Sequence, residues 1–211
     1  MKGSPMSSPV LLITEVTPKP GALSTLAAAW ATLPTPASAV QRAVYIAHDD
    51  STVLELTALP DVSSVFALRD HWEAEREHLG LQLASDFRRQ VLEFIEAPKN
   101  CAEPLPATPW LQLRHVEVPP AVHDDYLAWR ERTIFDVVRN SPEVEVFLAY
   151  HSLISTEPGV MFVSGFSGDV QAYGAVFSSP RYQQIVREAG SQFITGGDKG
   201  LYTKIYRRLP V

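Results

Sequence analysis

Residues 144–166 read V-E-V-F-L-A-Y-H-S-L-I-S-T-E-P-G-V-M-F-V-S-G-F, and this stretch decides the fold. Two apolar runs flank Glu157-Pro158-Gly159, a composition typical of a tight connection between antiparallel strands. We therefore predict a β-hairpin here. The other predicted helices and strands of the chain lie before and after hairpins of this kind.

The second half of the chain supplies the neighbours of this hairpin. Upstream, the pattern predicts a strand over residues 110–118 and a helix over 123–140, separated by Pro119-Pro120. Downstream, it predicts a helix over 169–190, with Asp169 as N-cap and a break at Ser179-Pro180, and a last strand over 201–208. The order of elements is therefore β-α-β-β-α-β.

The first half of the chain repeats this order. Strands are predicted over residues 10–16, 40–47, 53–57 and 90–96, and helices over 22–33 and 61–79, the second with Asp61 as N-cap. Pro20 precedes Trp30 by the same ten positions that separate Pro119 from Trp129. We therefore predict an α+β fold of two duplicated ferredoxin-like lobes that form an α+β barrel. The lobes are residues 1–97 and 110–211, and a Pro-rich, semi-rigid linker at 98–109 joins them.

Composition excludes several classes of protein. The formal charge of −6 and the isoelectric point near 5.5 argue against a nucleic-acid partner, because phosphate recognition needs a basic surface. Cys101 is the only cysteine and the six histidines are dispersed, so we expect no metal site and a reducing, cytoplasmic location. Residues 1–9 are expected to be a frayed lead-in, and no segment has the roughly 20 apolar residues needed to insert in a membrane.

A resemblance to a known family rests on the first half. Its strand, the junction T-P-K-P-G at residues 17–21, the amphipathic helix, and then a hairpin, a helix and a closing strand resemble the dimeric α+β barrel superfamily that includes the antibiotic biosynthesis monooxygenases. The resemblance implies two facing sheets, here within one chain, with a pocket between sheet and helices in each lobe; it leaves a homodimer open. Known members include cofactor-independent oxygenases of polyketide aromatics, haem-degrading enzymes, cyclases and isomerases.

The residues that carry this family's chemistry match only in part. Cofactor-independent and haem-degrading members typically use an Asn on the first strand and a Trp on the second helix. The two asparagines of this chain, Asn100 and Asn140, lie outside the predicted strands. Trp72 matches the family Trp, and the corresponding helix of the second lobe offers Tyr173 and Tyr182.

Two histidines of the second lobe are further candidates. His115 and His151 fall on strands that a third strand would separate, so level side chains would stand roughly 10 Å apart. That spacing suits two groups that flank a bound molecule, and Arg114 could stabilise an enolate or phenolate between them. The alternative is that His115 is paired within the core and His151 ends its strand.

Other motifs have structural interpretations. His71 and His78 could face a pocket, but the charged residues around them, including Glu75, favour a solvated helix flank. Ser167 lacks the G-x-S-x-G context of a hydrolase nucleophile. The glycine-rich residues 196–200 lack a phosphate-loop ending and predict a flexible turn or lid. Trp30 and Trp129 recur at equivalent positions and predict core packing.

The sequence therefore favours a small-molecule enzyme that resembles the antibiotic biosynthesis monooxygenases and acts on a hydrophobic aromatic or polyketide-like substrate by oxygenation or cyclisation without a cofactor. The catalytic candidates are His115, His151, Arg114, Tyr173 and Trp72. Two alternatives stay open. The pocket could bind haem or another apolar ligand without turnover, or the chain could be a structural or interaction protein.

Overall fold

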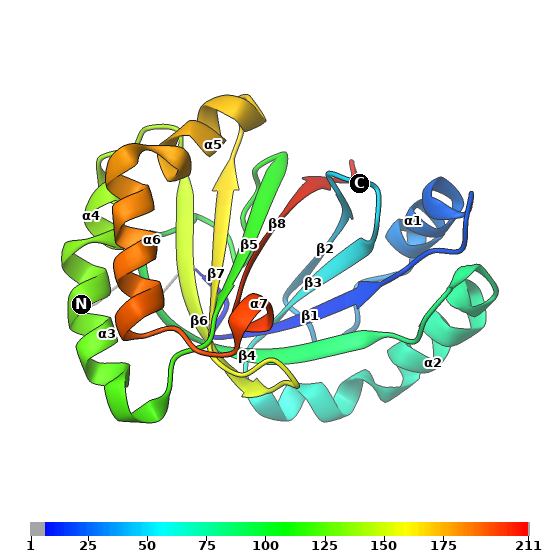
Figure 1. Ribbon diagram of the computed structural model, residues 1–211. Helices are drawn as coiled ribbons and strands as arrows, with labels where there is room; N and C mark the ends of the chain where they lie inside the picture. Colours follow the sequence, from blue (N-terminus) through cyan, green and yellow to red (C-terminus); the bar gives the residue numbers. More distant parts are fainter. Residues whose placement is uncertain (1–6, 211) are drawn as a thin grey trace.

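Antiparallel strands close into a barrel in the computed structural model, which describes residues 7–210 apart from the side chains of residues 198 and 199 (Figure 1). The strands are β1 Val10–Val16, β2 Gln41–Ala47, β3 Val53–Leu59, β4 Arg88–Lys99, β5 Trp110–Val116, β6 Val146–Ile154, β7 Val160–Phe166 and β8 Leu201–Arg208. The predicted hairpin is thus β6 and β7, paired from Val146 opposite Gly165 to His151 opposite Val160.

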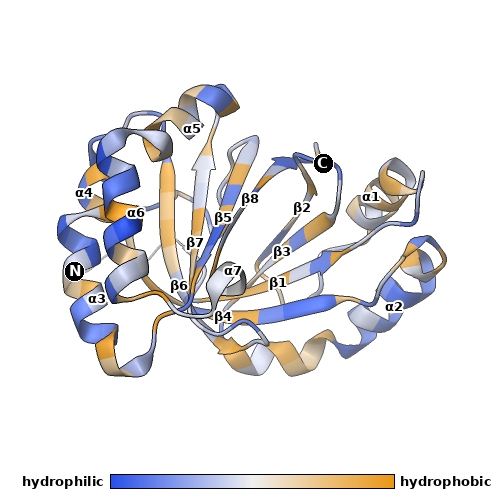
Figure 2. Cartoon of the chain, viewed as in Figure 1, coloured by the Kyte–Doolittle hydropathy of each residue, from blue (hydrophilic) through white to orange (hydrophobic). Residues whose placement is uncertain are grey.

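Helices cover the outside of the barrel. Their bounds are α1 Leu23–Thr32, η1 Val62–Leu68, α2 Arg69–Leu79, η2 Gly80–Gln82, η3 Pro120–Val122, α3 His123–Arg132, α4 Ile134–Arg139, α5 Val170–Ser178, α6 Pro180–Gln192 and α7 Gly197–Gly200. The pair α1 and α2 lies on one side, and α3, α4, α5 and α6 lie on the other (Figure 1). The helices carry both hydrophilic and hydrophobic residues; β6 is largely hydrophobic, whereas β4, β5 and β8 include hydrophilic stretches (Figure 2).

The order of strands around the barrel is β1-β3-β2-β8-β5-β7-β6-β4. It can be read as two four-stranded sheets, β4-β1-β3-β2 and β8-β5-β7-β6, in which the first, second, third and fourth strands of each half take the same places. The sheets join at two seams, where β2 pairs with β8 and β4 pairs with β6. The α+β barrel expected from the sequence is therefore the observed fold.

Successive side chains of each strand point alternately into the barrel and toward the helices, so the sheet has an apolar layer on each face. One face fills the barrel with side chains such as Leu54, Leu56, Leu113 and Tyr150. The other face packs under the helices, where Trp30 and Trp129 are each part of a separate buried cluster, as their recurrence predicted. Because both faces are covered, a strand such as β3 is buried at every position, and its residues are consequently mostly apolar.

Three segments differ from the expectations. The segment predicted as a semi-rigid linker, residues 98–109, begins with the end of β4 at Lys99, and its Cys101 and Leu105 pack into the apolar cluster that fills the barrel. Ser7 and Ser8 are buried rather than frayed, and Ser8 Oγ lies 3.0 Å from the carbonyl oxygen of Leu59; the rest of the proposed lead-in, residues 1–6, lies outside the described residues. The glycine-rich segment contains the short helix α7.

Candidate active site

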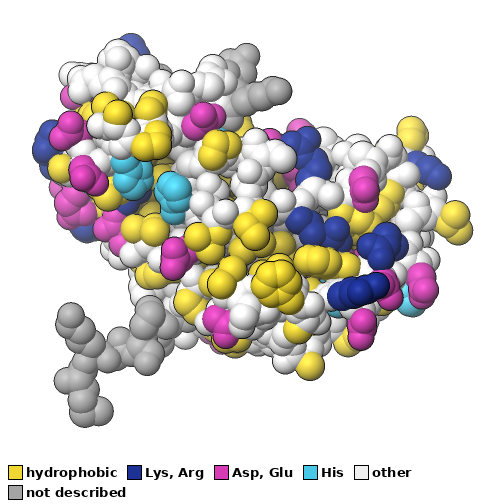
Figure 3. All heavy atoms as spheres, turned by 90° about the horizontal axis from the view of Figure 1, so that it is seen from below, with side chains coloured by type: hydrophobic (Ala, Val, Ile, Leu, Met, Phe, Trp, Pro, Cys, Tyr) yellow, Lys and Arg dark blue, Asp and Glu magenta, His cyan; other side chains and the backbone are white. Residues whose placement is uncertain are grey.

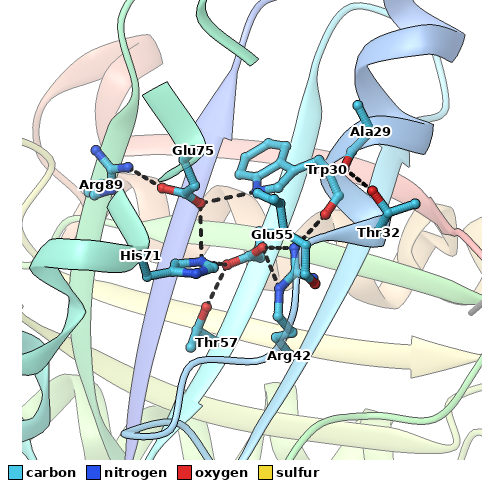
Figure 4. A network of polar contacts seen from close by, with 10 residues as sticks. Ala29, Trp30, Thr32, Arg42, Glu55, Thr57, His71, Glu75 and Arg89 are labelled. Carbon is cyan, nitrogen blue, oxygen red and sulfur yellow. Dashed lines mark hydrogen bonds and ion pairs between the residues drawn. The ribbon is translucent and has the colours of Figure 1, made fainter. Parts of the chain in front are cut away.

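A buried carboxylate stands on the outer face of the first sheet. Glu55 of β3 is 1% exposed, although its neighbours on both sides are leucines. Arg42 of β2 donates to Glu55 Oε2 through Nε, at 2.8 Å, and through Nη2, while Thr57 Oγ1 donates to Oε1 at 2.8 Å. The polar face made by these residues lies under α1 and α2 (Figure 4). Such burial requires compensation, which the guanidinium supplies.

Helix α2 adds a histidine and a second carboxylate. His71 Nε2 lies 3.9 Å from Glu55 Oε1 and 3.6 Å from Glu75 Oε1, so the imidazole stands between the two carboxylates (Figure 4). Glu75 is also 1% exposed and accepts a hydrogen bond from Trp30 Nε1 at 3.0 Å. His71 and Glu75 are four positions apart on α2, which places both on the face that meets the sheet.

The electrostatics of this cluster favour a charged imidazole. Burial by itself would lower the pKa of His71, but the Glu55 and Glu75 carboxylates outweigh burial and raise the pKa to about 9. Burial likewise opposes ionisation of Glu55, but contacts with His71 and Arg42 outweigh it and hold the pKa of Glu55 below its ordinary value. At neutral pH, His71 is therefore an imidazolium ion between two carboxylates.

Arg89 of β4 connects the buried cluster to the surface. Its Nη2 donates to Glu75 Oε2 at 2.5 Å. The guanidinium carbon lies 4.8 Å from the centre of the Trp72 ring and 4.5 Å from that of Phe87. Arg89 Nε is buried without a hydrogen-bond partner in the described part of the chain. The cation is therefore held in one orientation by a carboxylate and two rings, with one donor to spare.

A depression of about 670 Å3 opens beside this guanidinium. It is lined by Thr17, Ser85, Asp86, Phe87, Arg88, Arg89, Gln90, Thr156 and Glu157. Its volume falls within the range of small-molecule sites. It therefore brings a fixed cation, an aromatic ring and carboxylates to one accessible place.

Glu157, in the turn of the β6–β7 hairpin, is the best-held carboxylate of the depression. Tyr202 Oη donates to its Oε2 at 2.7 Å, and Arg88 Nη2 donates to its Oε1 at 2.9 Å. The side chain keeps 23% of its surface exposed. A base needs this combination of a fixed position and access to a substrate.

The two histidines proposed from the second lobe do not flank one pocket. His115 shares a strand face with Leu111 and Leu113 and points into the barrel, where its Nε2 lies 3.0 Å from the Pro158 carbonyl oxygen. His151 shares the opposite face with Ala149, outside the barrel. The prediction placed His115 and His151 level with each other on β5 and β6. Side chains alternate between the two faces of a sheet, however, and this alternation puts the two histidines on opposite faces.

The remaining candidates are divided between the lobes. Tyr173 of α5 is buried, with its hydroxyl 2.8 Å from Ser164 Oγ and 3.0 Å from Gln112 Oε1. Burial raises its pKa. Arg114 lies on the same outer face of the second sheet, 5.5 Å from the centre of the Tyr182 ring. Trp72 lies in the first lobe against Arg89, so the structure does not bring the five candidates together.

Sequence reasoning missed Glu55, Glu75, His71 and Arg89 as a group. The assignment of His71 and Glu75 to a solvated flank is wrong, because both side chains turn toward the sheet; the exposed His78 does lie on that flank. One signal was available: Glu55 stands inside the apolar run V-L-E-L-T-A-L, where an isolated carboxylate needs buried partners.

The cluster and the depression can be compared with metal and haem sites. Ligand atoms of Glu55, His71 and Glu75 lie within 4.8 Å of one another, a spacing that could hold a metal ion. A divalent cation would, however, add two charges beside Arg42 and Arg89, so a proton on His71 fits better. The depression offers haem no imidazole ligand, because none of its lining residues is a histidine; haem as an alternative ligand of the protein stays a prediction.

Comparison with known proteins identifies the fold. A candidate monooxygenase from Fusobacterium nucleatum superposes with a TM-score of 0.70 at 9% identity, over 97% of this chain and 94% of that one. An anthrone oxidase-like protein gives 0.69 at 13% identity, over 95% and 91%. A ferredoxin fold protein from Listeria monocytogenes, related to antibiotic biosynthesis monooxygenases, gives 0.54 at 8% identity, over 98% of each chain.

The chain shares the α+β barrel fold of these proteins. No protein-family model matches the chain, and no curated protein matches it. At these identities the likeness concerns the fold, and the chemistry has to be argued from the site. In the part of the chain that the structure describes, no helix has the length and apolarity to cross a membrane; the cytoplasmic location stays a prediction.

Proposed function

We propose that the protein is a small-molecule enzyme that oxygenates or cyclises a hydrophobic aromatic or polyketide-like substrate bound in the depression beside Arg89. The observation that carries this proposal is the fixed guanidinium of Arg89, which Glu75 and the Trp72 and Phe87 rings hold at the wall of a cavity of about 670 Å3. A preorganised cation stabilises negative charge that develops on a substrate without reorganising during the reaction.

The first step is the removal of a proton from an acidic C–H or phenolic O–H group. Glu157 accepts that proton, and the partly exposed guanidinium of Arg89 stabilises the enolate or phenolate by its charge. The buried cluster of His71, Glu55 and Arg42 does not touch the substrate. It holds Glu75, and Glu75 in turn holds Arg89. The role of the cluster is therefore to position the guanidinium of Arg89.

The anion can react in two ways. In oxygenation, the carbanion reacts with dioxygen, so that a methylene group and one O2 give a ketone and one water. In cyclisation, the enolate carbon attacks a carbonyl carbon of the same substrate, a C–C bond forms, and the resulting alkoxide takes up a proton. Neither route needs a cofactor. The anthrone oxidase-like neighbour supports the aromatic ketone anthrone as a first test substrate.

Oxygen uptake and anthraquinone formation with anthrone test this proposal. Arg89→Met should lower kcat/KM by about 100-fold or more, because it removes a transition-state contact. Arg69→Met is the matched control on α2, since its side chain is 84% exposed and pairs only with Glu73 in the described residues; it should leave turnover unchanged. Equal activity of the Arg89→Met variant and the control would contradict the assignment.

We further infer that the chain arose by duplication of one ferredoxin-like unit, with lobes at residues 1–97 and 110–211. The matching strand orders and the recurring Trp30 and Trp129 support this inference. A superposition of the two halves tests it, because equivalent strands must align in sequence order. After such a duplication the lobes can diverge, so that one keeps chemistry that the other lacks.

A further inference from the structure

Two histidines that are distant in the sequence meet on the outside of the barrel. His123 is the first residue of α3, and His151 lies on the outer face of β6. Their ring centres are 5.5 Å apart, and the ring planes make an angle of 88°. Two imidazoles that share a metal ion have ring centres roughly 5 Å apart, because each metal–nitrogen bond is about 2.0 to 2.1 Å long. The observed spacing is therefore close to that of two ligands of one ion.

The ring nitrogens of this pair are in a state that suits metal binding. His123 Nε2 is buried and has no hydrogen-bond partner in the described part of the chain. His151 Nδ1 lies 3.2 Å from the Ser152 carbonyl oxygen, and a proton on Nδ1 leaves Nε2 with its lone pair. Burial, and then the nearby His151 and Arg130, lower the pKa of His123, so its ring is neutral at neutral pH. The neutral imidazole is the form that binds metal ions.

Glu93 of β4 provides a carboxylate next to the two histidines. It is directly opposite His151 in the antiparallel ladder between β4 and β6, so both side chains point to the same face, with Cβ atoms roughly 5 Å apart. The Glu93 side chain is exposed and makes no hydrogen bond or ion pair with the residues that the structure describes. It can therefore turn toward the imidazoles without breaking another interaction. Histidine and acidic side chains lie near one another at the surface in the view from below (Figure 3).

We propose that His123, His151 and Glu93 form a binding site for a divalent transition-metal ion, Zn²⁺. Two imidazoles and one carboxylate are a known ligand set of Zn²⁺, and a water molecule completes its four-coordinate geometry. The site spans the seam between β4 of the first half and β6 and α3 of the second, so a bound ion ties the two halves together. None of its three residues lines the depression at Arg89, and the site is therefore independent of the proposed catalysis.

Titration of Zn²⁺ into the full chain, produced without an affinity tag and stripped of metal with EDTA, tests the site. Calorimetry should show stoichiometric binding, and Zn²⁺ should raise the midpoint of thermal unfolding because it binds the folded state. His123→Gln, His151→Gln and Glu93→Gln should each weaken the affinity by about tenfold or more, since each removes a ligand. All three side chains are at least partly exposed, so the variants should fold, and circular dichroism checks that they do.

His71→Gln is the matched control, because Glu55, His71 and Glu75 form another group whose spacing could hold an ion. This variant should bind Zn²⁺ as tightly as the unaltered protein. The proposal is wrong if the full chain does not bind Zn²⁺ stoichiometrically, or if His71→Gln abolishes the binding. It is also wrong if the affinity is unchanged in any of the three variants of the proposed ligands.

Discussion

His71 shows how partners decide the charge of a single residue. The carboxylates of Glu55 and Glu75 overcome burial and raise its pKa to about 9, well above the value of about 6.5 expected in the unfolded chain. A group whose pKa is raised by folding stabilises the folded state fully below its unfolded pKa. That contribution is lost as the pH rises through the folded pKa, here between about 6.5 and 9.

We therefore predict that the free energy of unfolding contains a contribution from His71, on the order of 2 kcal/mol, that disappears between pH 6.5 and about 9.5. Urea unfolding of the unaltered protein and of His71→Gln should show a large difference at pH 6.5 and little at pH 9.5. His78→Gln is the control, because His78 is exposed on the same helix. A difference that does not change with pH would show that His71 is not charged in the folded protein.

The role of a single residue could be predicted from the sequence where it depends on residues close by in the chain. The N-caps Asp61 and Asp169 follow from the local sequence alone, and both are observed: Asp61 accepts from the backbone N–H of Ser64, and Asp169 accepts from those of Gln171 and Ala172. The cluster of Glu55, His71 and Arg89 joins residues that β pairing and helix packing bring together. No window of the sequence contains that information.

At the scale of elements, the start of α5 gives the clearest quantitative expectation. Asp169 Oδ1 accepts from the backbone N–H of Gln171 at 2.8 Å and of Ala172 at 3.0 Å. Asp169→Ala should lower the free energy of unfolding by about 1 kcal/mol, measured by urea unfolding at neutral pH. Asp169→Asn should retain most of the stability, since Asn also caps helices. Equal losses in the two variants would point to a role other than capping.

The sequence predicted correctly which segments are helices and which are strands, because strands covered on both faces form short, nearly continuous apolar runs. The strand order within each sheet followed from the β-α-β-β-α-β order, and Ser179-Pro180 correctly marked the boundary between α5 and α6. Two boundaries required tertiary information. The first turns of the helix after Pro60 adopt 3-10 geometry in η1, and β4 continues to Lys99 because it pairs with β6 of the other half.

At the scale of the molecule, closure of the barrel joins the halves. The inner apolar cluster draws on both sheets, with Leu54 and Leu56 from one and Leu113 and Leu148 from the other. The exterior also carries exposed apolar side chains, the largest exposed fractions belonging to Leu81 and Phe66. In the view from below, apolar side chains gather over the middle of the face beside a group of basic ones (Figure 3).

Because each sheet covers the other, we predict that neither half folds stably alone. Residues 1–109 and 110–211, produced separately, should aggregate or self-associate, since each exposes one wall of the inner cluster and two unpaired strand edges. Size-exclusion chromatography with light scattering and circular dichroism checks this expectation against the full chain. Two monomeric halves with cooperative unfolding would show that the lobes are independent domains.

The central claim is that Arg89 stabilises a substrate anion in the depression that β4 lines together with the turn of the β6–β7 hairpin. Deuterium exchange into the methylene group of anthrone and of smaller enolisable aromatic ketones, followed by NMR without oxygen, tests it most directly because exchange reports the proton transfer alone. The unaltered protein and Arg69→Met should accelerate exchange, and Arg89→Met should not. No acceleration by the unaltered protein, or equal acceleration by Arg89→Met, would contradict the claim.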